Sequence, residues 1–579
     1  MKLIEALEVL REEQPLHAEK FRACLVCGFT PLHLQTFLQA RLRLILPDRR
    51  IAIHSGLYGD FWGNLNGVET AGADVCVVAM EWSDLDPRLG LRSLGSWQPS
   101  ILSEVSENAE FRLSRFVEIV GKLSRDIPFV ISFPTLPLPP ISFSPGWQAS
   151  VFDLKLRAFT SSAAAKVAQI GNVKVLNSER MDRFSPPGDR FDAKSDLASG
   201  FPYRLAHASA LAEMLSRMIS PAVPKKGLIT DLDDTLWSGI LGEAGVDGVF
   251  WDLEHHSQLH GLYQRLLQAV SETGVLIAAA SKNDPELVDK ALERDDLVLQ
   301  RSALFPVEAH WGPKSESVSR ILKTWNIGAD SVVFLDDSPM ELAEVKAAHP
   351  GVECILFPKN DPQALVDLLY QLRDLFGKTV LSEEDRIRQE SIRRHQESAQ
   401  EFESHGGNLD TFLAQAEAEI TLNFSKEPID PRAFELINKT NQFNLNGKRY
   451  TEAAWQAYVK RPDTFLLVVA YKDKYGTLGK IAVLAGRRQE KTILLDVWVM
   501  SCRAFSRRIE HRCLDELLKC YQADEIVFDF VATAKNGPLR EFLAQVLGSE
   551  PGTQSRLSKQ QFVTLQEETF HRVLEVSNG

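Results

Sequence analysis

The distribution of apolar and polar residues predicts alternating strands and helices over the first part of the chain, residues 1–222. Short apolar runs occur at residues 25–26 and 74–78, and stretches with helical periodicity lie between such runs. Another apolar run at 129–132 predicts a strand, and the proline-rich stretch at 133–140 predicts an exposed loop that borders a cleft. This part is therefore expected to form an α/β domain.

The middle part, residues 223–378, repeats the order strand then helix, which favours a parallel, doubly wound sheet. Its predicted strands are residues 227–230, 275–280 and 331–335. In open α/β sheets, ligands bind beyond the carboxyl ends of the strands. Because Asp231, Ser281 and Asp336 follow these strands, we expect their side chains to converge at one edge.

Two more segments complete the predicted organisation. Residues 379–408 form a highly charged stretch with helical character, which predicts a connector. Residues 409–579 alternate helical stretches with apolar runs such as 465–470 and 493–500, which predicts a separate α/β domain. The fold class is therefore multidomain α/β, with a doubly wound parallel sheet at its centre.

Length and composition agree with several folded domains. The chain has 579 residues, too many for one ordinary core, and its 44% hydrophobic and 25% charged residues are typical of globular proteins. The formal net charge of -13 argues against general binding to nucleic acids or to acidic membranes.

The sequence offers no targeting or membrane signal, which predicts a cytoplasmic protein. Residues 1–8 are charged and lack the apolar core of a signal peptide, and no apolar run is long enough to span a bilayer. Seven cysteines in so long a chain do not suggest a disulfide framework. Cys24 and Cys27 form a CxxC pair within a strand-like run, and we expect burial there rather than zinc binding or redox chemistry.

The acidic turn after the first central strand carries residues suited to phosphoryl transfer. A carboxylate fixed at a strand end can attack phosphorus and form an aspartyl phosphate, and Asp231 meets this requirement. Asp233, two residues later, is the candidate general acid and base for the leaving oxygen and the attacking water. Thr235 is expected to hold the turn.

The same pattern predicts a Mg²⁺ site, because carboxylate oxygens are the ligands that this hard cation prefers. We expect Asp231, Asp233 and Asp336 to hold the ion, with Asp336 a more direct ligand than the adjacent Asp337. Negative charge on the phosphoryl oxygens requires a facing cation and a hydroxyl, and Lys314 and Ser281 are the candidates.

This ordered set resembles the haloacid dehalogenase (HAD) superfamily, whose motifs are DxDxT, a Ser or Thr, a Lys and an acidic pair. The spacing from Asp231 to Ser281 and from Ser281 to Lys314 leaves room for a flap and core helices but not for a large cap domain. We therefore expect a capless site, which a large substrate or a neighbouring domain must close.

Five stretches extend the resemblance to the FkbH-like glyceryl transferase/phosphatase family, in HAD subfamily IIIC: residues 231–239, 281–283, 438–444, 500–503 and 533–536. The resemblance implies an enzyme that takes a glyceryl unit from 1,3-bisphosphoglycerate and removes phosphate. It leaves the unit as a thioester on an acyl carrier protein for polyketide-type biosynthesis. The residues expected to bind substrate are Thr235, Lys282, Asn283, Asn441, Gln442, Asn444 and Arg503.

Such an enzyme needs either a thiol relay or a direct route to the phosphopantetheine thiol of the carrier. Cys502 is the candidate relay, because cations such as Arg503 beside it lower a thiol's pKa, although a structural cysteine is an open alternative. A basic cluster of Arg503, Arg507, Arg508 and Arg512 could meet the acidic face of a carrier or be a solvated helix face.

The two flanking domains show looser resemblances. The last domain is similar to the GNAT acyltransferase fold, but Ser506 and Arg508 replace small residues of its pyrophosphate-binding turn, so coenzyme A is not expected as a cofactor. The first domain resembles the SGNH-hydrolase fold, yet residues 27–30 lack the nucleophilic serine. Asp196 and His207 are not at DxxH spacing, so we expect docking or substrate covering there, without hydrolase activity.

Two other functions compete with glyceryl transfer. One is a simple Mg²⁺-dependent phosphatase for a small phosphoester or modified sugar phosphate. The other is a noncatalytic carrier-binding scaffold, which the acidic set disfavours because clustered carboxylates repel one another without a metal.

Overall fold

The computed structural model describes residues 1–14, 18–70, 72–93, 98–378, 381, 385, 392, 409–440, 442–474, 476–501, 504–505, 507–533, 536–565 and 568–576. The predicted connector at 379–408 lies almost entirely outside the described residues. The chain divides into two compact units, Met1–Val223 and Pro224–Gly579, and the second contains two separate sheets.

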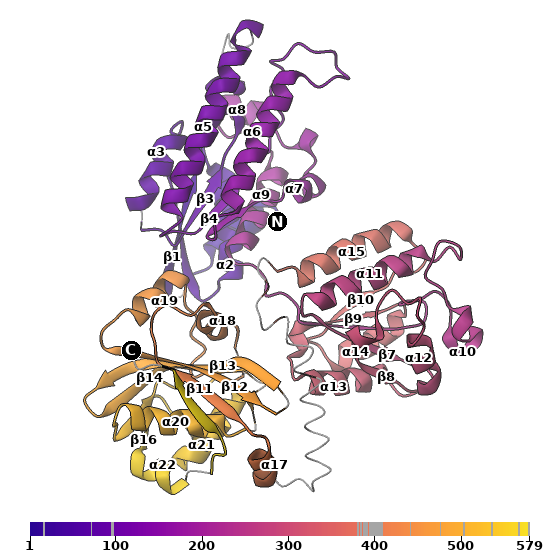
Figure 1. The fold of residues 1–579 in the computed structure, drawn as a ribbon. Helices are drawn as coiled ribbons and strands as arrows, with labels where there is room; N and C mark the ends of the chain where they lie inside the picture. The colour runs from indigo at the N-terminus through magenta and orange to yellow at the C-terminus, as the bar shows by residue number, and fades with distance from the viewer. Residues whose placement is uncertain are drawn as a thin grey trace. The chain divides into compact units, whose positions relative to one another are not determined.

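The first unit is a parallel α/β domain with strand order β2-β1-β3-β4-β5 (Figure 1). Its strands are β1 (Glu19–Val26), β2 (Arg49–Ser55), β3 (Val75–Ala79), β4 (Phe129–Ser132) and β5 (Val173–Val175). Its helices are α1 (Leu3–Arg11), α2 (Leu32–Ile45), α3 (Phe61–Asn66), α4 (Trp82–Leu85), α5 (Leu102–Leu123), α6 (Val151–Ala168), α7 (Ser178–Phe184), α8 (Ala193–Ser199) and α9 (Leu205–Ile219). The strand predicted at 129–132 is confirmed as β4.

Alternation along β1 explains why this sheet is covered on both faces. Cys24 and Val26 join one core with residues of α5 and α6, whereas Ala23, Leu25 and Cys27 join the opposite core with residues of α2 and α9. Cys24 and Cys27 are free cysteines, and both are buried, as predicted.

The central sheet is also parallel, with strand order β10-β9-β6-β7-β8. Its strands are β6 (Gly227–Thr230), β7 (Leu276–Ser281), β8 (Leu304–Ala309), β9 (Val332–Asp336) and β10 (Glu353–Leu356). Its helices are α10 (Leu241–Ala244), α11 (Gln258–Glu272), α12 (Pro285–Leu292), α13 (Lys314–Trp325), α14 (Pro339–Ala348) and α15 (Pro362–Phe376). The predicted doubly wound sheet is confirmed, with the first predicted strand matching β6 residue for residue.

Neighbouring residues of β6 face opposite cores. Leu228 packs in a core with residues of α11, α12 and α15, whereas Ile229 packs in a core with residues of α13 and α14. The helices therefore cover both faces of the sheet and leave the ends of the strands as the open edges.

The last sheet is mixed, with strand order β16-β15-β14-β13-β12-β11-β17. Its strands are β11 (Glu419–Asn423), β12 (Thr464–Asp473), β13 (Gly476–Gln489), β14 (Thr492–Met500), β15 (Glu525–Phe528), β16 (Ser555–Ser558) and β17 (Arg572–Val576). Its helices are α17 (Leu409–Gln415), α18 (Pro431–Lys439), α19 (Glu452–Val459), α20 (Ile509–Cys520), α21 (Gly537–Leu547) and α22 (Lys559–Leu565). Residues of α20, α21 and α22 share the core on one face, and residues of α18 and α19 share the core on the other. None of the described helices has the length and apolar character needed to cross a membrane.

Replacing Gly227 with alanine is expected to destabilise the central domain. A Cβ there would lie 2.5 Å from the ring of Trp325, which is 1% exposed and cannot move away easily. Overpacking of this kind costs about 1–3 kcal/mol in the free energy of unfolding. Thermal unfolding of the full chain measures the effect, and Gly552→Ala is the control because its added Cβ meets no atom within 4 Å. Equal stability of the two variants would contradict the packing argument.

Candidate active site

The carboxyl ends of three neighbouring strands form the centre of the site. β6 lies between β7 and β9, and Thr230 at its end pairs with Ala279 on one side and Leu335 on the other. Asp231 therefore follows β6 at the edge where Ser281 ends β7 and Asp336 ends β9. The convergence expected for these residues is present.

Lys314 links the acidic residues of this edge. Its Nζ lies 2.7 Å from Asp231 Oδ1, 2.6 Å from Asp336 Oδ2 and 2.6 Å from Glu341 Oε2. The side chain of Lys314 is 3% exposed, and a buried charge must be paired to be tolerated. As the first residue of α13, Lys314 is fixed by that helix at the sheet edge.

Glu341 is a site residue that the sequence analysis missed. It lies in the first turn of α14 and pairs with both Lys314 and Lys282, whose Nζ is 2.9 Å from Glu341 Oε1. The signal that could have revealed it is an acidic residue five positions after Asp336, in the helix that begins there. Lys282, expected to bind substrate, thus lies beside the cluster but is engaged by a carboxylate.

Asp337 belongs to a second ion-pair group at the same edge. Lys359 Nζ lies 2.7 Å from Asp337 Oδ2 and 2.9 Å from Asp234 Oδ2, and these two carboxylates raise the lysine's pKa. Lys359 was also missed, because no motif surrounds it. It ties the turn after β6 to the turn after β9.

Asp233 has its carboxylate oriented by three donors. Oδ1 accepts hydrogen bonds from the indole N–H of Trp237 at 3.0 Å and the backbone N–H of Leu241 at 3.1 Å. Oδ2 accepts one at 2.9 Å from the amide of Asn283, which also donates to Ser281 Oγ at 3.0 Å. The structure therefore brings Asp233, Asn283 and Ser281 together, as a group beside the Lys314 cluster.

The turn after β6 explains the place of Thr235. Asp234 adopts a left-handed φ of 50°, and its Oδ1 accepts a hydrogen bond from the N–H of Gly239, which has a φ of 106°. Thr235 is fully buried, and its hydroxyl has no hydrogen-bond partner among the described residues. The hydrogen bond between Asp234 and Gly239 bridges the turn, and the roles of Thr235 in holding the turn and in contacting substrate stay predictions.

Two opposing effects set the pKa values of the ionisable groups around Lys314: burial disfavours their charged forms, and ion pairing favours them. Burial raises the pKa of Asp231 to about 8 and that of Asp336 to about 6, while Lys314 opposes both shifts. The carboxylates around Lys314 raise its pKa in spite of burial, so the ammonium stays charged. Lys314 and Lys282 together lower the pKa of Glu341 against its own desolvation.

The donor set fits a hard divalent cation. Asp231, Asp336 and Asp337 each offer a carboxylate oxygen, and these oxygens lie within 4.8 Å of one another. The sequence predicted Asp233 as the third metal ligand. Among the described residues, the third carboxylate close enough to share an ion with Asp231 and Asp336 is that of Asp337. The carboxylate of Asp233 faces its three donors instead, so its service as a metal ligand stays a prediction.

Of the site residues predicted in the last domain, the structure describes Gln442 and Asn444. Cys502, Arg503 and Asn441 lie outside the described residues. Gln442 is exposed, whereas Asn444 is 3% exposed and uses its side chain within its own turn. Its Oδ1 accepts hydrogen bonds from the N–H groups of Asn446 and Gly447, and its amide donates to the carbonyl of Thr440.

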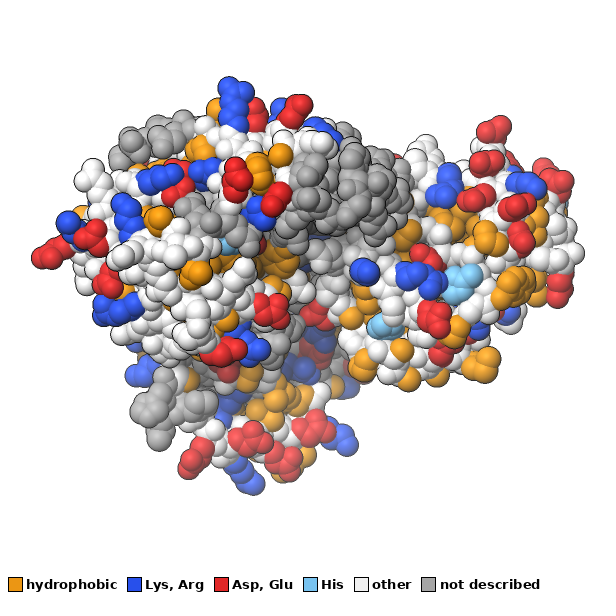
Figure 2. Space-filling view, turned by 90° about the horizontal axis from the view of Figure 1, so that it is seen from below, with side chains coloured by type: hydrophobic (Ala, Val, Ile, Leu, Met, Phe, Trp, Pro, Cys, Tyr) orange, Lys and Arg blue, Asp and Glu red, His pale blue; other side chains and the backbone are white. Residues whose placement is uncertain are grey.

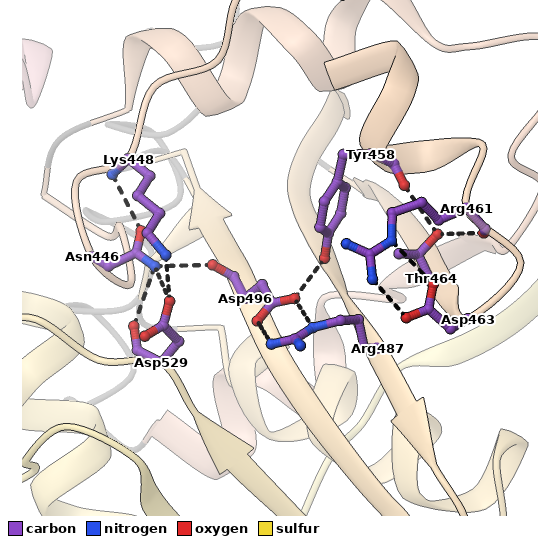
Figure 3. Close-up of polar contacts among 9 residues, drawn as sticks. All are labelled: Asn446, Lys448, Tyr458, Arg461, Asp463, Thr464, Arg487, Asp496 and Asp529. Carbon is purple, nitrogen blue, oxygen red and sulfur yellow. Dashed lines mark hydrogen bonds and ion pairs between the residues drawn. The ribbon is translucent and has the colours of Figure 1, made fainter. Parts of the chain in front are cut away.

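Residues 443–446 run along the part of β14 that β15 does not cover. β15 pairs with β14 only as far as Leu495, and beyond it Leu445 donates to the carbonyl of Trp498 while Met500 donates to that of Phe443. Asn446 closes the segment by donating to the backbone carbonyl of Asp496 and to Asp529 (Figure 3). Of the residues expected to bind substrate here, Asn444 therefore lies in a segment that completes the sheet.

The described arginines of the predicted basic cluster are paired within the domain. Arg508 binds Asp410 at 2.7 Å, Arg512 lies 3.4 Å from Asp515 and 3.3 Å from Glu516, and all three described arginines are largely buried. These three arginines therefore form neither a basic surface that is free to meet a carrier nor a solvated helix face. On the face shown in Figure 2, basic and acidic side chains are interspersed.

The residues considered for hydrolysis in the first unit are not assembled as a catalytic group. His207 contacts the hydroxyls of Thr135 at 2.9 Å and Ser185 at 3.0 Å, and burial lowers its pKa to about 3. Thr30 donates its hydroxyl proton to the carbonyl of Ser199. Asp196 makes no described hydrogen bond to His207, and the lack of hydrolase activity stays a prediction.

Comparison with known proteins shows a shared fold. No family model matches the chain, and no curated protein matches it. Among solved structures, the N-terminal part of protein BF1531 from Bacteroides fragilis, which contains a phosphatase domain and was crystallised with Mg, is 20% identical. The match covers 66% of this chain and 100% of that chain with a TM-score of 0.52. An uncharacterised protein from Corynebacterium glutamicum, also 20% identical, covers 27% of this chain and 98% of its own, with a TM-score of 0.19.

The likeness to the Bacteroides structure establishes the multidomain α/β fold. The match covers 66% of the chain. Because none of the three sheets with its helices takes up that much of the chain, the match includes more than the central sheet. At this identity the chemistry has to be argued from the side chains themselves.

Mg²⁺ is expected to bind more tightly as the pH rises between about 6 and about 8. Burial keeps Asp231 and Asp336 partly protonated in this range, whereas the ion requires carboxylates, so binding releases protons at the lower pH. Titration calorimetry at neutral pH, in two buffers of different ionisation enthalpy, measures the number of protons released. A pH-independent affinity without proton release would show that these carboxyl groups are already ionised.

Proposed function

We propose that this chain is a Mg²⁺-dependent phosphatase of the HAD type. The observation that carries the proposal is the buried ammonium of Lys314, bound to Asp231, Asp336 and Glu341 at the common edge of three parallel strands. Buried clusters of perturbed ionisable groups at such an edge are the expected setting for catalysis.

Asp231 is the proposed nucleophile. Its carboxylate attacks phosphorus to form an aspartyl phosphate, and the bond from phosphorus to the leaving oxygen breaks. Lys314, 2.7 Å from that carboxylate, and Ser281 at the end of β7 are suited to stabilise the phosphoryl oxygens. Mg²⁺ held by Asp231, Asp336 and Asp337 would neutralise further charge on these oxygens.

Asp233 is the proposed general acid and base. It gives a proton to the leaving oxygen and later removes one from the water that hydrolyses the aspartyl phosphate. The hydrogen bonds from Trp237, Leu241 and Asn283 would hold its carboxylate in one orientation through both steps. This orientation supports a catalytic role over a role as a solvated turn residue.

The proposed site has no inserted cap domain. Between β6 and β7 the chain forms α10, a short turn and α11, and between β7 and Lys314 it forms α12 and β8. Water must therefore be excluded by the substrate or by another part of the protein. This openness favours a substrate carried by a macromolecule.

Asp231→Asn is expected to lower Mg²⁺-dependent phosphate release by about a thousandfold, because the amide cannot form an aspartyl phosphate. Release of inorganic phosphate from p-nitrophenyl phosphate and acetyl phosphate measures the effect. Asp295→Asn, which alters an exposed carboxylate of the same domain, is the matched control. Phosphate release that survives in the Asp231 variant would refute the proposed nucleophile.

We further propose that the phosphatase serves glyceryl transfer from 1,3-bisphosphoglycerate to the phosphopantetheine thiol of an acyl carrier protein. The support is the resemblance carried by residues 231–239, 281–283, 438–444, 500–503 and 533–536. The acyl phosphate of this substrate is activated toward a thiol, whose attack forms a thioester and releases one phosphate. The second phosphate, an ordinary ester, would then be the substrate of Asp231.

The structure limits where acyl transfer could occur in the last domain. Residues 443–446 fill the uncovered edge of β14, and Asn536 secures them through its amide to the carbonyls of Asn444 and Val531. A carrier thiol must therefore approach another surface, or this segment must move. The paired Arg507, Arg508 and Arg512 do not support carrier docking at the predicted basic cluster.

Intact-mass measurement of a holo carrier tests this proposal against a simple phosphatase for a small phosphoester or sugar phosphate. With the full chain and 1,3-bisphosphoglycerate, we expect a glyceryl thioester on the carrier. The Asp231→Asn variant should instead leave a phosphoglyceryl thioester, heavier by one phosphoryl group, because transfer does not need that carboxylate. Cys502→Ala distinguishes the routes, since a direct transfer would survive it and a relay would not. Phosphate release without any acylated carrier would favour the simple phosphatase.

A further inference from the structure

The first unit contains a cavity of about 580 Å³ at the carboxyl ends of its parallel strands. The residues after β1, β3 and β4 form its walls, with Gly28 and Phe29 after β1 and the proline-rich loop after β4. The chain passes from β1 outward to β2 and then back to β3 on the other side, so β1 and β3 flank the topological switch point. Ligands of open α/β sheets bind at this point, and the volume suits a small metabolite.

Most of the wall is apolar and aromatic. Phe29, Tyr58, Trp82, Leu138 and Phe191 line it, together with prolines of the loop at 136–140. This composition favours a ligand with an apolar body. The proline-rich loop predicted to border a cleft thus does border one.

Three buried carboxyl groups interrupt the apolar wall. Glu81, Asp84 and Asp196 are 3%, 6% and 8% exposed. Glu81 is occupied by the protein itself: its oxygens accept hydrogen bonds from Thr135 and Tyr203 at 2.7 and 2.8 Å and from the N–H of Leu136 at 3.2 Å. It therefore has a structural role.

Asp84 and Asp196 retain unused acceptors. Asp84 Oδ2 accepts from the N–H of Glu81 at 2.8 Å, but within the described chain no donor reaches Oδ1, and none reaches the carboxylate of Asp196. Asp84 Oδ1 lies against Gly28, where a Cβ would be only 1.9 Å from this oxygen, so a residue with a side chain would displace the carboxyl group. Unpaired carboxyl groups in an apolar cavity are costly and indicate a missing partner.

Arg92 does not supply that partner. Arg92 is the one cationic side chain among the described residues that line the cavity. Its guanidinium lies over the ring of Tyr58, 5.6 Å from the ring centroid. Its Nη1 donates to the backbone carbonyl of Asp196 at 2.5 Å and not to the carboxylate. The cavity therefore carries an excess of acidic groups, which disfavours phosphates and other anions.

We propose that this cavity binds a small organic cation, an apolar molecule that carries a protonated or quaternary ammonium group. Such a group would form charge-assisted contacts with Asp84 and Asp196 and would interact with the faces of Tyr58 and Trp82. Burial raises the pKa of Asp84 to about 8 and also raises that of Asp196, and the charges of Arg112 and Arg92 offset these two shifts only in part. This ligand class differs from the phosphorylated substrate of the central domain.

The proposal is tested with the full chain and a set of matched probes. The cations are 2-phenylethylammonium and benzyltrimethylammonium, the neutral analogue is 2-phenylethanol, and the anion is 3-phenylpropionate. Titration calorimetry and Trp fluorescence measure binding. We expect a cation to bind at least about tenfold more tightly than the alcohol, with no binding of the anion.

Variants separate the carboxyl groups from the cavity wall. Asp84→Asn and Asp196→Asn should each weaken cation binding by about tenfold, and the exposed Asp126→Asn should leave it unchanged. Leu138→Trp fills the cavity from its rim without touching a carboxyl group, so it should abolish binding even if an aspartate variant fails to fold. Phosphate release should be unaffected in all of them.

Several results would overturn the assignment. They are failure of both cations to bind, equal or tighter binding of the alcohol or the anion, and cation binding that survives Leu138→Trp. Equal or tighter binding of the alcohol would indicate a hydroxylated neutral ligand, and binding of the anion would indicate that Arg92 governs recognition.

Discussion

The buried ammonium of Lys314 is the interaction on which the central site depends. It binds three carboxylates that come from the end of β6, the end of β9 and the first turn of α14. Each of these charges would be costly alone in the interior, and each is tolerated because the others are present. The start of α13, two strand ends and α14 must therefore take up their positions together.

The same constraint explains which parts of the site were predictable from the sequence. Asp231, Ser281 and Asp336 follow strands that are buried on both faces, and such strands have a strong apolar signal. The edge strands β8 and β10 are only partly buried, and neither was predicted. Glu341 lies in α14 and Lys359 follows the unpredicted strand β10, and their role arises from contacts across the fold that no local pattern encodes.

The polar residues 438–444 show a different limit of sequence analysis. Asn441, Gln442 and Asn444 within residues 438–444 were expected to bind substrate. In the structure, Asn444, Asn446 and Asn536 satisfy backbone groups where β14 extends past β15. A run of buried amides can serve either purpose, and the sequence contains nothing that separates ligand recognition from the pairing of a strand's free edge.

The two parallel sheets place ligand sites by the same rule but with opposite chemistry. At the central sheet, the buried Lys314 and the exposed Lys359 balance a dense group of carboxylates, a setting for a dication and phosphate. At the first sheet, aromatic and proline residues surround two carboxyl groups with unused acceptors, and the nearby arginine binds a backbone carbonyl. Strand order fixes where a ligand can bind, whereas the few side chains at the strand ends decide its charge. The proposed cation would make the first domain a binding module with its own ligand, because its strand ends carry no counterpart of the Lys314 ion-pair cluster among the described residues.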